Sequence, residues 1–204
     1  MTHSIVRRAA LFLFASFVLV FAGLLGGCQS YDALVERDQT CDQKWADVEA
    51  NLQRRYDLIP NLVETAKGSA KHEEETLTKV MDARSMAASI KLTADDLTDP
   101  AKMAAFEKAQ DQLKGPLSRL MVIDERYPDL KANQAFHDLQ KQLEGTENRI
   151  LIARRDYNAA VKDYNTELGK IRGQAVNKIT GKPFKQRVYF NASTEAQAAP
   201  KVSF

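Results

Sequence analysis

The fold is decided by residues 133–173, which read NQAFHDLQKQLEGTENRILIARRDYNAAVKDYNTELGKIRG. Apolar side chains recur there every three or four residues, which is the spacing of one face of an α-helix. The pattern predicts one helix from Asn133, its N-cap, to Gly173, roughly 60 Å long at 1.5 Å per residue. A compact globule does not cover so long a helix, so it needs antiparallel neighbours of similar length. The predicted inner face consists of Phe136, Leu139, Leu143, Thr146, Ile150, Ala153, Tyr157, Ala160, Tyr164, Leu168 and Ile171.

The chain before this helix supplies two of the neighbours. The same spacing begins at Leu34 and resumes after weak points at Pro60 and at Gly68-Ser69, and we expect a kink or short break at the proline. The pattern then continues from Leu77 to about Ala88. The first inner face consists of Leu34, Cys41, Trp45, Val48, Leu52, Tyr56, Ile59, Val63, Ala66 and Ala70.

A further helix is predicted from Pro100 to about Arg126. Asp99 before Pro100 is typical of an N-cap followed by the first helical position, and Gly115-Pro116 predicts a bend. Its inner face consists of Met103, Phe106, Leu113, Leu117, Leu120 and Met121. The sequence therefore predicts an all-α protein: an elongated antiparallel three- to four-helix bundle with long helices and an irregular C-terminal tail.

Residues 174–204 have no apolar period. We expect a short docked segment from Phe184 to Phe190, which closes a bundle domain over 28–190, and a mobile tail over 191–204. Six cations and no acidic residue lie between Leu168 and Thr194. Two interpretations are open for this stretch: a patch for anionic headgroups or an acidic partner, or a solvated end whose aromatic side chains pack on the bundle.

The first 27 residues have the features of an export signal. A basic start with Arg7 and Arg8 precedes the apolar run 9–25, and residues 25–28 read Leu-Gly-Gly-Cys. This motif resembles the bacterial lipobox, in which the peptide is cut before the cysteine and Cys28 is lipidated. Gln29 in place of Asp then favours the outer membrane over the inner one, with the body in the periplasm. The alternative is an uncleaved transmembrane anchor, since the run lies near the lower limit of spanning length.

Composition excludes two classes of protein. Arg7 and Arg8 account for the formal net charge of +2, so the rest of the chain is neutral and lacks the basic excess of a nucleic-acid-binding protein. A hydrophobic content of 44% is enough for a packed core and argues against disorder. With Cys28 lipidated, Cys41 is the remaining thiol, and its place on the apolar face predicts a small core residue.

Catalytic motifs are absent from the sequence. His72 and His137 lack the partners of a zinc helix or a di-metal bundle, and no glycine-rich phosphate loop is present. We therefore predict no catalytic site, no metal and no cofactor. A hydrolase that uses Cys41 or His72 remains the enzymatic alternative, because the members of a catalytic dyad meet only in the fold.

Polar residues surround Pro60. The proline leaves the carbonyl oxygen of Tyr56 without its helical donor, and Asp57 or Asn61 is a candidate to satisfy the exposed backbone. Arg55 lies beside the apolar face, where its charge calls for a carboxylate from another helix. A structural kink with a supporting polar network is the simplest interpretation, and a small-ligand site at the kink is the alternative.

Several of these motifs resemble the LemA family. They are RRYDLIPNLV at 54–63 followed by Lys71-His72-Glu73 and Ala83-Arg84, YPDLK at 127–131, ENRI at 147–150, RRDYN at 154–158, and the ending PKVSF at 200–204. The resemblance implies a membrane-tethered antiparallel helical bundle without established catalytic activity. Many members have an uncleaved membrane helix, whereas this chain carries a lipobox.

The resemblance also suggests a role. Genes of the family often lie near those of membrane zinc proteases, which implies envelope quality control by association. We therefore expect a non-enzymatic envelope lipoprotein that presents its bundle to an unidentified envelope protein, a membrane protease being one candidate, with no nucleic-acid partner. Motif residues that would form a polar interior or a contact surface are Arg55, Asp57, Pro60, Asn61, Tyr127, Pro128, Glu147, Asn148, Arg155, Tyr157 and Asn158.

Overall fold

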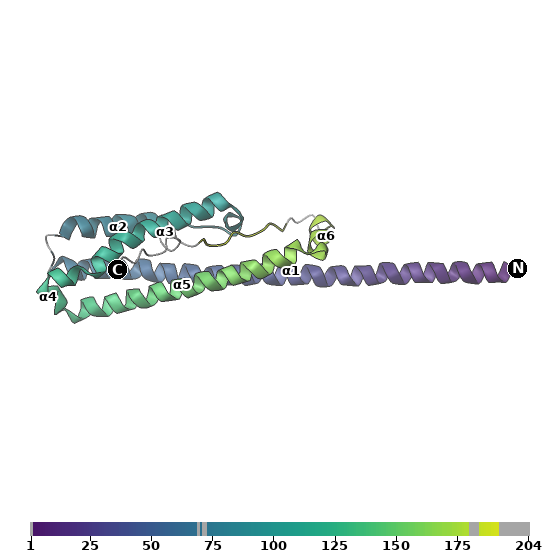
Figure 1. Cartoon of the computed structure of the whole chain (residues 1–204), viewed down its shortest axis with the longest axis horizontal. Coiled ribbons are helices and arrows are strands. Elements are labelled where there is room, and N and C mark those ends of the chain that lie inside the picture. Colours follow the sequence, from purple (N-terminus) through teal and green to yellow (C-terminus); the bar gives the residue numbers. More distant parts are fainter. Residues whose placement is uncertain (1, 69, 71–72, 180–183, 192–204) are drawn as a thin grey trace, which may run out of the picture. The chain divides into compact units, whose positions relative to one another are not determined.

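The computed structural model describes residues 2–68, 70, 73–179 and 184–191 (Figure 1). For residues 2–30 and for Val176 and Ile179 it describes the helical path alone. Every regular element in this part of the chain is a helix, and long helices pack together, so the predicted all-α bundle is confirmed. Residues 192–204 of the predicted tail over 191–204, and His72, lie outside the described residues.

The chain divides into two compact units, and two long helices contribute to both. Of the described residues, those up to 40 and those from 162 to 186 form the first unit, and those from 41 to 161 and from 187 to 191 form the second. Helix α1 (Thr2–Lys67) passes from the first unit to the second, and α5 (Gln134–Gly169) passes back. Helix α1 runs without interruption through the predicted signal segment, and that assignment stays a prediction.

The second unit is a bundle built on the later part of α1 and the earlier part of α5. Helix α2 (Glu74–Ser89) turns back along α1, and α3 (Pro100–Met121) reverses again and packs against α2 (Figure 1). Three short helices complete the connections: η2 (Asp96–Thr98), η3 (Ile123–Arg126) and α4 (Pro128–Lys131). Helices α1 and α5 contact each other through Trp45 and Tyr157, whose ring centroids are 5.4 Å apart.

Burial follows the predicted inner faces closely. All ten residues of the first face are buried, and Cys41 is completely so, which confirms it as a core residue. Of the face of α5 within the second unit, Leu139 alone is half-buried and the others are buried. The free energy gained from apolar burial, about 25 cal/mol per Å², therefore comes from the helix faces that the sequence periodicity identified.

The predicted caps are present. The Asp99 carboxylate accepts hydrogen bonds from the backbone N–H groups of Ala101, at 2.8 Å, and Lys102, at 3.4 Å. The Asn133 side chain does the same for Ala135 and Phe136, at 3.0 and 3.3 Å. Both side chains thus satisfy N–H groups that the first turn of a helix leaves unpaired.

The helix boundaries differ from prediction at three places. Helix α1 continues through Pro60 without a break and ends at Lys67, beside the predicted weak point at Gly68. Helix α3 ends at Met121 and continues as the tighter η3, so the expected single helix to Arg126 is wrong. The predicted helix to Gly173 ends at Gly169, and a separate helix α6 (Ile171–Ile179) follows. Ile171 is consequently exposed instead of buried.

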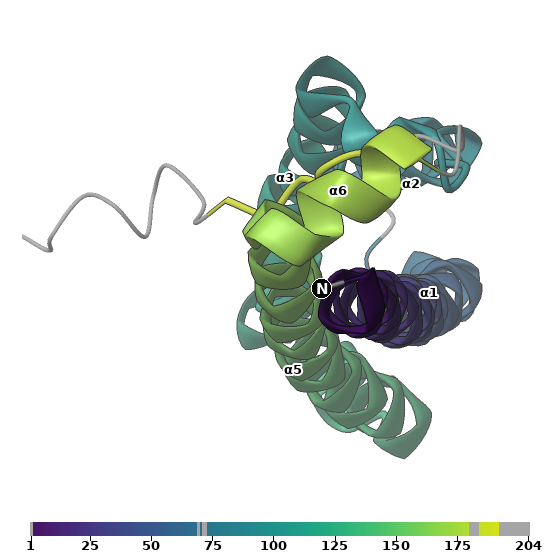
Figure 2. The same cartoon turned by 90° about the vertical axis from the view of Figure 1, so that its right-hand side faces the viewer.

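In the first unit α5 contacts α1, and α6 follows α5 along the chain. The Arg37 guanidinium of α1 lies 3.6 Å from the Glu167 carboxylate of α5, which also pairs with Lys170 at 2.8 Å. The Lys170 hydrogen bond lowers the pKa of Glu167 below its ordinary value. A side chain at Gly173 would collide with the backbone carbonyl oxygens of α5, so glycine is required where α6 turns back. Figure 2 shows α6 crosswise to the axis of α1.

Candidate functional site

A buried polar network lies at the centre of the second unit. Arg55 of α1 pairs with Glu147 of α5, with Nη1 and Oε1 3.2 Å apart, as its position beside the apolar face predicted. Its other terminal nitrogen, Nη2, donates to the side-chain oxygen of Gln110 in α3. The same oxygen accepts a hydrogen bond from the Tyr56 hydroxyl at 2.9 Å. The network therefore fixes the register of three helices.

Within this network the side chain of Arg55 is far more buried than that of Glu147. The Arg55 side chain is 5% exposed, whereas that of Glu147 is 44% exposed. The Nε atom of Arg55 has no hydrogen-bond partner among the described residues. Arg55 is therefore stabilised by two of its three nitrogens, and the loss of either partner leaves a buried charge under-compensated.

Arg84 supplies the hydrogen bond that Pro60 cannot donate. The proline has no N–H to donate to the carbonyl oxygen of Tyr56, four residues earlier. The Nε atom of Arg84, from α2, donates to that oxygen at 2.7 Å. This role was predicted for Asp57 or Asn61, and neither fills it: both are exposed, and Asp57 accepts a hydrogen bond from Gln53 at 2.7 Å. A donor from another helix thus keeps α1 continuous across its proline.

Tyr127 and Pro128 lie where η3 passes into α4. Pro128 is exposed at the first position of α4, where a helix needs no backbone N–H. The Tyr127 hydroxyl donates to the Glu73 carboxylate at 3.1 Å, and the Arg126 guanidinium lies 3.0 Å from the same carboxylate. The Tyr127 hydroxyl and the Arg126 guanidinium therefore connect the start of α2 to the turn before α5. Neither Tyr127 nor Pro128 takes part in the Arg55 network.

The docked C-terminal segment is the second feature that the predicted residues build. Asn158 forms two hydrogen bonds with the backbone of Phe190: its Nδ2 donates to the carbonyl oxygen at 3.0 Å, and its Oδ1 accepts from the N–H at 2.9 Å. The Tyr157 hydroxyl donates to the carbonyl oxygen of Val188 at 3.3 Å, and burial raises the pKa of this phenol. The N–H of Val188 donates to the carbonyl oxygen of Leu97 at 2.9 Å. Side chains and loops thus replace the strand partner that an extended segment lacks.

An aromatic cluster anchors the same segment. The Phe190 ring stacks on Trp45, with centroids 5.7 Å apart and planes 19° apart, and contacts the rings of Phe106 and Tyr157. The guanidinium of Arg154 lies 4.5 Å from the centroid of the Phe190 ring, at cation–π distance. The prediction of a docked segment from Phe184 to Phe190 is therefore confirmed, but its predicted end is wrong. Asn191, assigned to the mobile tail, donates its N–H to the Glu107 carboxylate at 2.7 Å and accepts a hydrogen bond from Arg154 at 3.0 Å.

Arg187 belongs to this docked segment and not to a solvated basic stretch. It is 5% exposed, and its Nη2 lies 2.8 Å from the Asp42 carboxylate of α1. Counting it with the exposed cations of the C-terminal region was therefore wrong. Charge counting along a sequence does not distinguish a buried, paired arginine from a solvated one.

The remaining predicted residues lie at the surface of α5. Asn148 and Arg155 are exposed, and Arg155 has a loose pair with the adjacent Asp156, at 3.6 Å. Between them, on the same face by helical spacing, lie Leu151 and Ile152, which are 67% and 49% exposed. The structure thus separates most of the predicted motif residues into three groups: the interior network around Arg55, the residues that hold the C-terminal segment, and an exposed face of α5. The Asn158 clamp is the name used below for the two hydrogen bonds between Asn158 and the backbone of Phe190.

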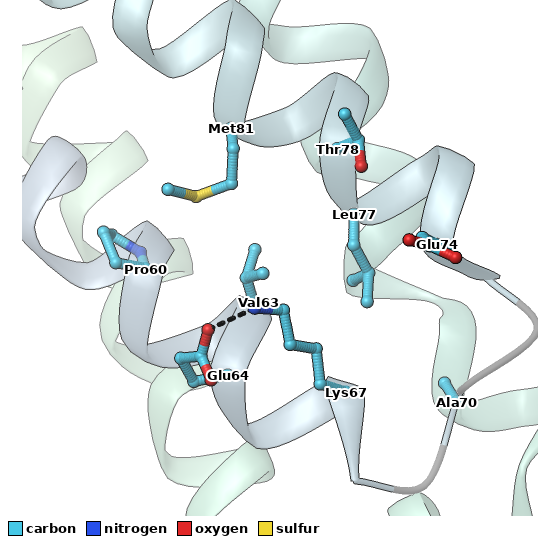
Figure 3. Close-up of a pocket in the computed structure, with 9 residues that line it drawn as sticks. All are labelled: Pro60, Val63, Glu64, Lys67, Ala70, Glu74, Leu77, Thr78 and Met81. Atoms are coloured by element: carbon cyan, nitrogen blue, oxygen red, sulfur yellow. Dashed lines mark hydrogen bonds and ion pairs between the residues drawn. The ribbon is translucent and has the colours of Figure 1, made fainter.

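A pocket lies where α1 and α2 diverge beside Pro60 (Figure 3). Its volume is about 500 Å³, which is within the range of small-molecule sites. Glu64 and Lys67 form an ion pair at its edge, 2.5 Å apart. The wall consists of Pro60, Val63, Glu64, Lys67, Ala70, Glu74, Leu77, Thr78 and Met81.

Sequence reasoning missed two residues of these sites. Gln110 is buried and joins Arg55 to Tyr56, although its spacing from Phe106 and Leu113 on the inner face of α3 was a usable signal. Arg84 lies on the period that resumes at Leu77 and in the Ala83-Arg84 motif, but neither pattern predicted its hydrogen bond to Tyr56. Among the described residues no group of three or more potential metal ligands converges. Over the part of the chain whose side chains are described, no helix has the length and apolarity to cross a membrane.

Together these features define a class: a helical-bundle protein whose core is completed by an extended C-terminal segment. The chain belongs to the LemA family, whose model matches residues 44–204. It is 27% identical over 176 residues to the magnetosome protein MamQ 2 of Paramagnetospirillum magneticum and 26% identical over 177 residues to MamQ of Magnetospirillum gryphiswaldense. These alignments cover 78% and 79% of this chain and 64% of each relative.

The similarity extends to a relative that carries the family name. Protein LemA of Metamycoplasma hominis is 27% identical over 122 residues, which is 59% of this chain and 51% of that protein. The chain thus spans less than two thirds of the length of these curated relatives. The matched region of the family contains the polar network, the Asn158 clamp and the outer face of α5.

Proposed function

We propose that this chain is a non-enzymatic, membrane-anchored envelope protein that binds a protein partner through the outer face of α5. The observation that carries the proposal is the exposed pair Leu151 and Ile152, flanked by Asn148 and Arg155. Adjacent exposed aliphatic side chains with polar flanks are typical of an interaction surface. The outer face of α5 is defined here as these four residues.

The anchor rests on the N-terminal sequence. Lipidation at Cys28 holds the chain to the envelope, with the body in the periplasm and the outer membrane favoured because Gln29 is not Asp. Several acyl chains hold firmly because each buried methylene contributes about 0.8 kcal/mol. An uncleaved transmembrane helix over residues 9–25 is the alternative anchor. Mass spectrometry of the mature N-terminus distinguishes them, since an unmodified Met1 contradicts cleavage and lipidation.

The side chains of this face determine which partner it fits. Leu151 and Ile152 would pack against an apolar helix face of an envelope protein. The Arg155 side chain, 76% exposed, would pair with a carboxylate beside that apolar face. A membrane zinc protease is the first candidate to test, since the family resemblance implies association with such enzymes. A partner of this kind places the protein in envelope quality control.

Site-specific photocrosslinking tests the proposal. A photoreactive residue at Leu151 in the full chain is expected to give an adduct with one envelope protein, and a matched position at exposed Asp111 in α3 is not. The adduct should be lost in Arg155→Glu and kept in Lys141→Glu, which changes a charge elsewhere on the exposed surface of α5. Equal adducts from both crosslinker positions, or indifference to Arg155→Glu, would contradict the proposal.

The pocket beside Pro60 supports a second candidate function, the binding of a small molecule. Its wall combines Val63, Leu77 and Met81 with the charged edge of Glu64 and Lys67, a composition suited to an amphiphilic ligand (Figure 3). A thermal-shift screen of envelope metabolites against the full chain and against Thr78→Phe, which fills the pocket, tests it. A ligand that stabilises both variants equally, or no ligand at all, rules this site out.

A further inference from the structure

Helix α6 presents an unusual outer face in the first unit. Ile171 is 87% exposed, the highest exposure among the large apolar residues described. Gln174, Ala175 and Lys178 share its side of the helix by spacing and are exposed, whereas Gly173 on the opposite side is buried. Ile171 therefore lies on the solvent side of α6, opposite the buried Gly173.

Basic side chains surround this isoleucine. Arg172, Lys178 and Lys185 are exposed, and none of the three forms an ion pair with any described residue. The sequence has no acidic residue between Leu168 and Thr194 to neutralise them. The basic surface is defined here as Ile171, Arg172, Lys178 and Lys185. It combines an apolar side chain with uncompensated positive charge, the composition of helices that lie at a membrane interface.

Two sets of contacts fix the basic surface close to the predicted anchor. Asn177 of α6 forms two hydrogen bonds with the backbone of Phe184, at 2.7 and 3.0 Å. The Phe184 ring in turn packs edge-on against Tyr31 of α1, with centroids 6.0 Å apart. Tyr31 follows Cys28 by three residues, which is roughly 4.5 Å along a helix. The basic surface is therefore tied to α1 within about one turn of the lipidation site.

The orientation of α6 suits a membrane surface. In Figure 2 α1 is seen end-on while α6 extends across the view, so the two helix axes are crosswise within the first unit. An anchor that enters a bilayer along α1 would place a crosswise helix parallel to the bilayer plane. Such a helix exposes its side chains to headgroups along its whole length.

We infer that the basic surface of α6 lies on anionic phospholipid headgroups, next to the point where the N-terminal anchor enters the membrane. This inference rests on the anchor of the proposed function, and it adds the lipid class and the residues that recognise it. Ile171 inserts at the boundary of headgroups and acyl chains, while Arg172, Lys178 and Lys185 contact the phosphates. Each cation strengthens association with an anionic surface roughly fivefold, so the three together contribute on the order of 100-fold.

Quenching by brominated lipids tests the inference in the full chain. The variant Ile171→Trp is reconstituted into brominated phosphatidylcholine vesicles with or without phosphatidylglycerol, and its fluorescence is compared with that of the unsubstituted chain, whose Trp45 is buried. We expect added quenching in phosphatidylglycerol vesicles, loss of it at high salt, and loss of it when Arg172, Lys178 and Lys185 are all changed to Glu. Leu151→Trp, which places an exposed tryptophan on α5, is the matched control and should stay unquenched.

The outcomes separate the inference from the anchor. If the Ile171→Trp chain floats with vesicles and shows no added quenching, the inference is overturned and the anchor is kept; this is the result expected if the surface binds an acidic protein. Quenching that is equal in both vesicles and survives the triple substitution also overturns it. A chain that floats with neither vesicle overturns both proposals. Flotation that needs phosphatidylglycerol and the three cations supports the lipid contact of the basic surface, but it contradicts the anchor and with it the place of the surface beside the anchor.

Discussion

Asn158 and Phe190 are joined as two strands of a sheet would be, although one of them lies in a helix. The amide of Asn158 donates to the carbonyl oxygen of Phe190 and accepts from its N–H, at 3.0 and 2.9 Å. In the first unit Asn177 holds Phe184 in the same way. An asparagine amide has the donor and acceptor of a peptide group, so it can replace a strand neighbour at a single position.

Loss of the Asn158 clamp should lower the free energy of unfolding by a measurable amount. Asn158→Ala removes both hydrogen bonds and leaves the backbone N–H and carbonyl of buried Phe190 without these partners, which should cost about 1–3 kcal/mol in the free energy of unfolding. Urea denaturation of the purified chain measures this cost. Asn148→Ala, at an exposed position of the same helix, is the control and should change it by less than about 0.5 kcal/mol. Equal costs would show that the clamp has no energetic role.

Trp45 reports directly on the docked segment, because it is the single tryptophan of the chain and stacks on Phe190. Phe190→Ala should lower the free energy of unfolding by about 3–5 kcal/mol. It should also shift Trp45 emission to longer wavelength as water reaches the ring. Tyr189→Ala changes an exposed neighbour and should leave the emission unchanged. An unshifted spectrum in the phenylalanine variant would contradict this docking.

Glu147 should contribute more to the free energy of unfolding than its exposed side chain suggests. Glu147→Gln removes the carboxylate that faces the buried guanidinium of Arg55, and we expect a cost of about 1–3 kcal/mol, reduced from that of a fully buried pair by the solvent around the glutamate. Glu144→Gln changes an exposed carboxylate of the same helix and should cost little. Urea denaturation compares the two variants, and a ranking in the opposite order would disprove the assigned pairing.

Arg84 and Pro60 should be energetically coupled. Arg84→Met leaves the carbonyl oxygen of Tyr56 without a donor and should cost about 1–3 kcal/mol. Pro60→Ala restores a backbone N–H that can reach the same oxygen, so the cost of Arg84→Met should fall by at least about 0.5 kcal/mol in that background. A double-mutant cycle measured by urea denaturation tests this coupling. Purely additive effects would mean that Arg84 acts in some other way.

The free energy of unfolding at acid pH should depend on the charge of Asp96. The Lys102 ammonium, helped by hydrogen bonds from Thr93, lowers the pKa of Asp96 from 3.8 to about 2. A carboxyl whose pKa is depressed by folding stabilises the native state above its unfolded pKa, and the contribution is lost as the pH falls from 3.8 to about 2. In Asp96→Asn the loss of stability over this pH interval should be smaller, as followed by urea midpoints. Asp111→Asn, an exposed position in α3, should retain the slope of the unsubstituted chain.

Periodicity predicted the long helices and most of their inner faces, since burial follows the apolar spacing from Leu34 to Ala70 and along α5, but it did not predict α6. The caps at Asp99 and Asn133 were also predicted, because capping needs only a side chain next to its own helix. Both features are local, and local chemistry is readable from neighbouring residues. The docked segment was located by its aromatic residues alone.

Contacts between distant residues account for what the sequence did not predict. Pro60 predicted a kink or short break because it has no N–H for the carbonyl oxygen of Tyr56. The donor that reaches this oxygen is Arg84, from the next helix, in place of the local candidates Asp57 and Asn61. Ile171 fits the period of α5 but lies beyond Gly169, where the helix ends. Arg187 and Gln110 are buried because Asp42 and Arg55 lie opposite them, and neither pairing leaves a local pattern.

The position of Phe190 near the end of the described chain has a consequence for how the protein forms. The ring of Trp45 is covered by Phe190, 145 positions further along the chain, and the rings of Phe106 and Tyr157 meet in the same place. Any process that delivers the chain from its N-terminus, such as synthesis or export, therefore leaves the core open until Phe190 has emerged. Contacts so distant in sequence form slowly, because a long loop must close before they are made. During that interval the unfinished bundle exposes its aromatic core to whatever else is in the compartment.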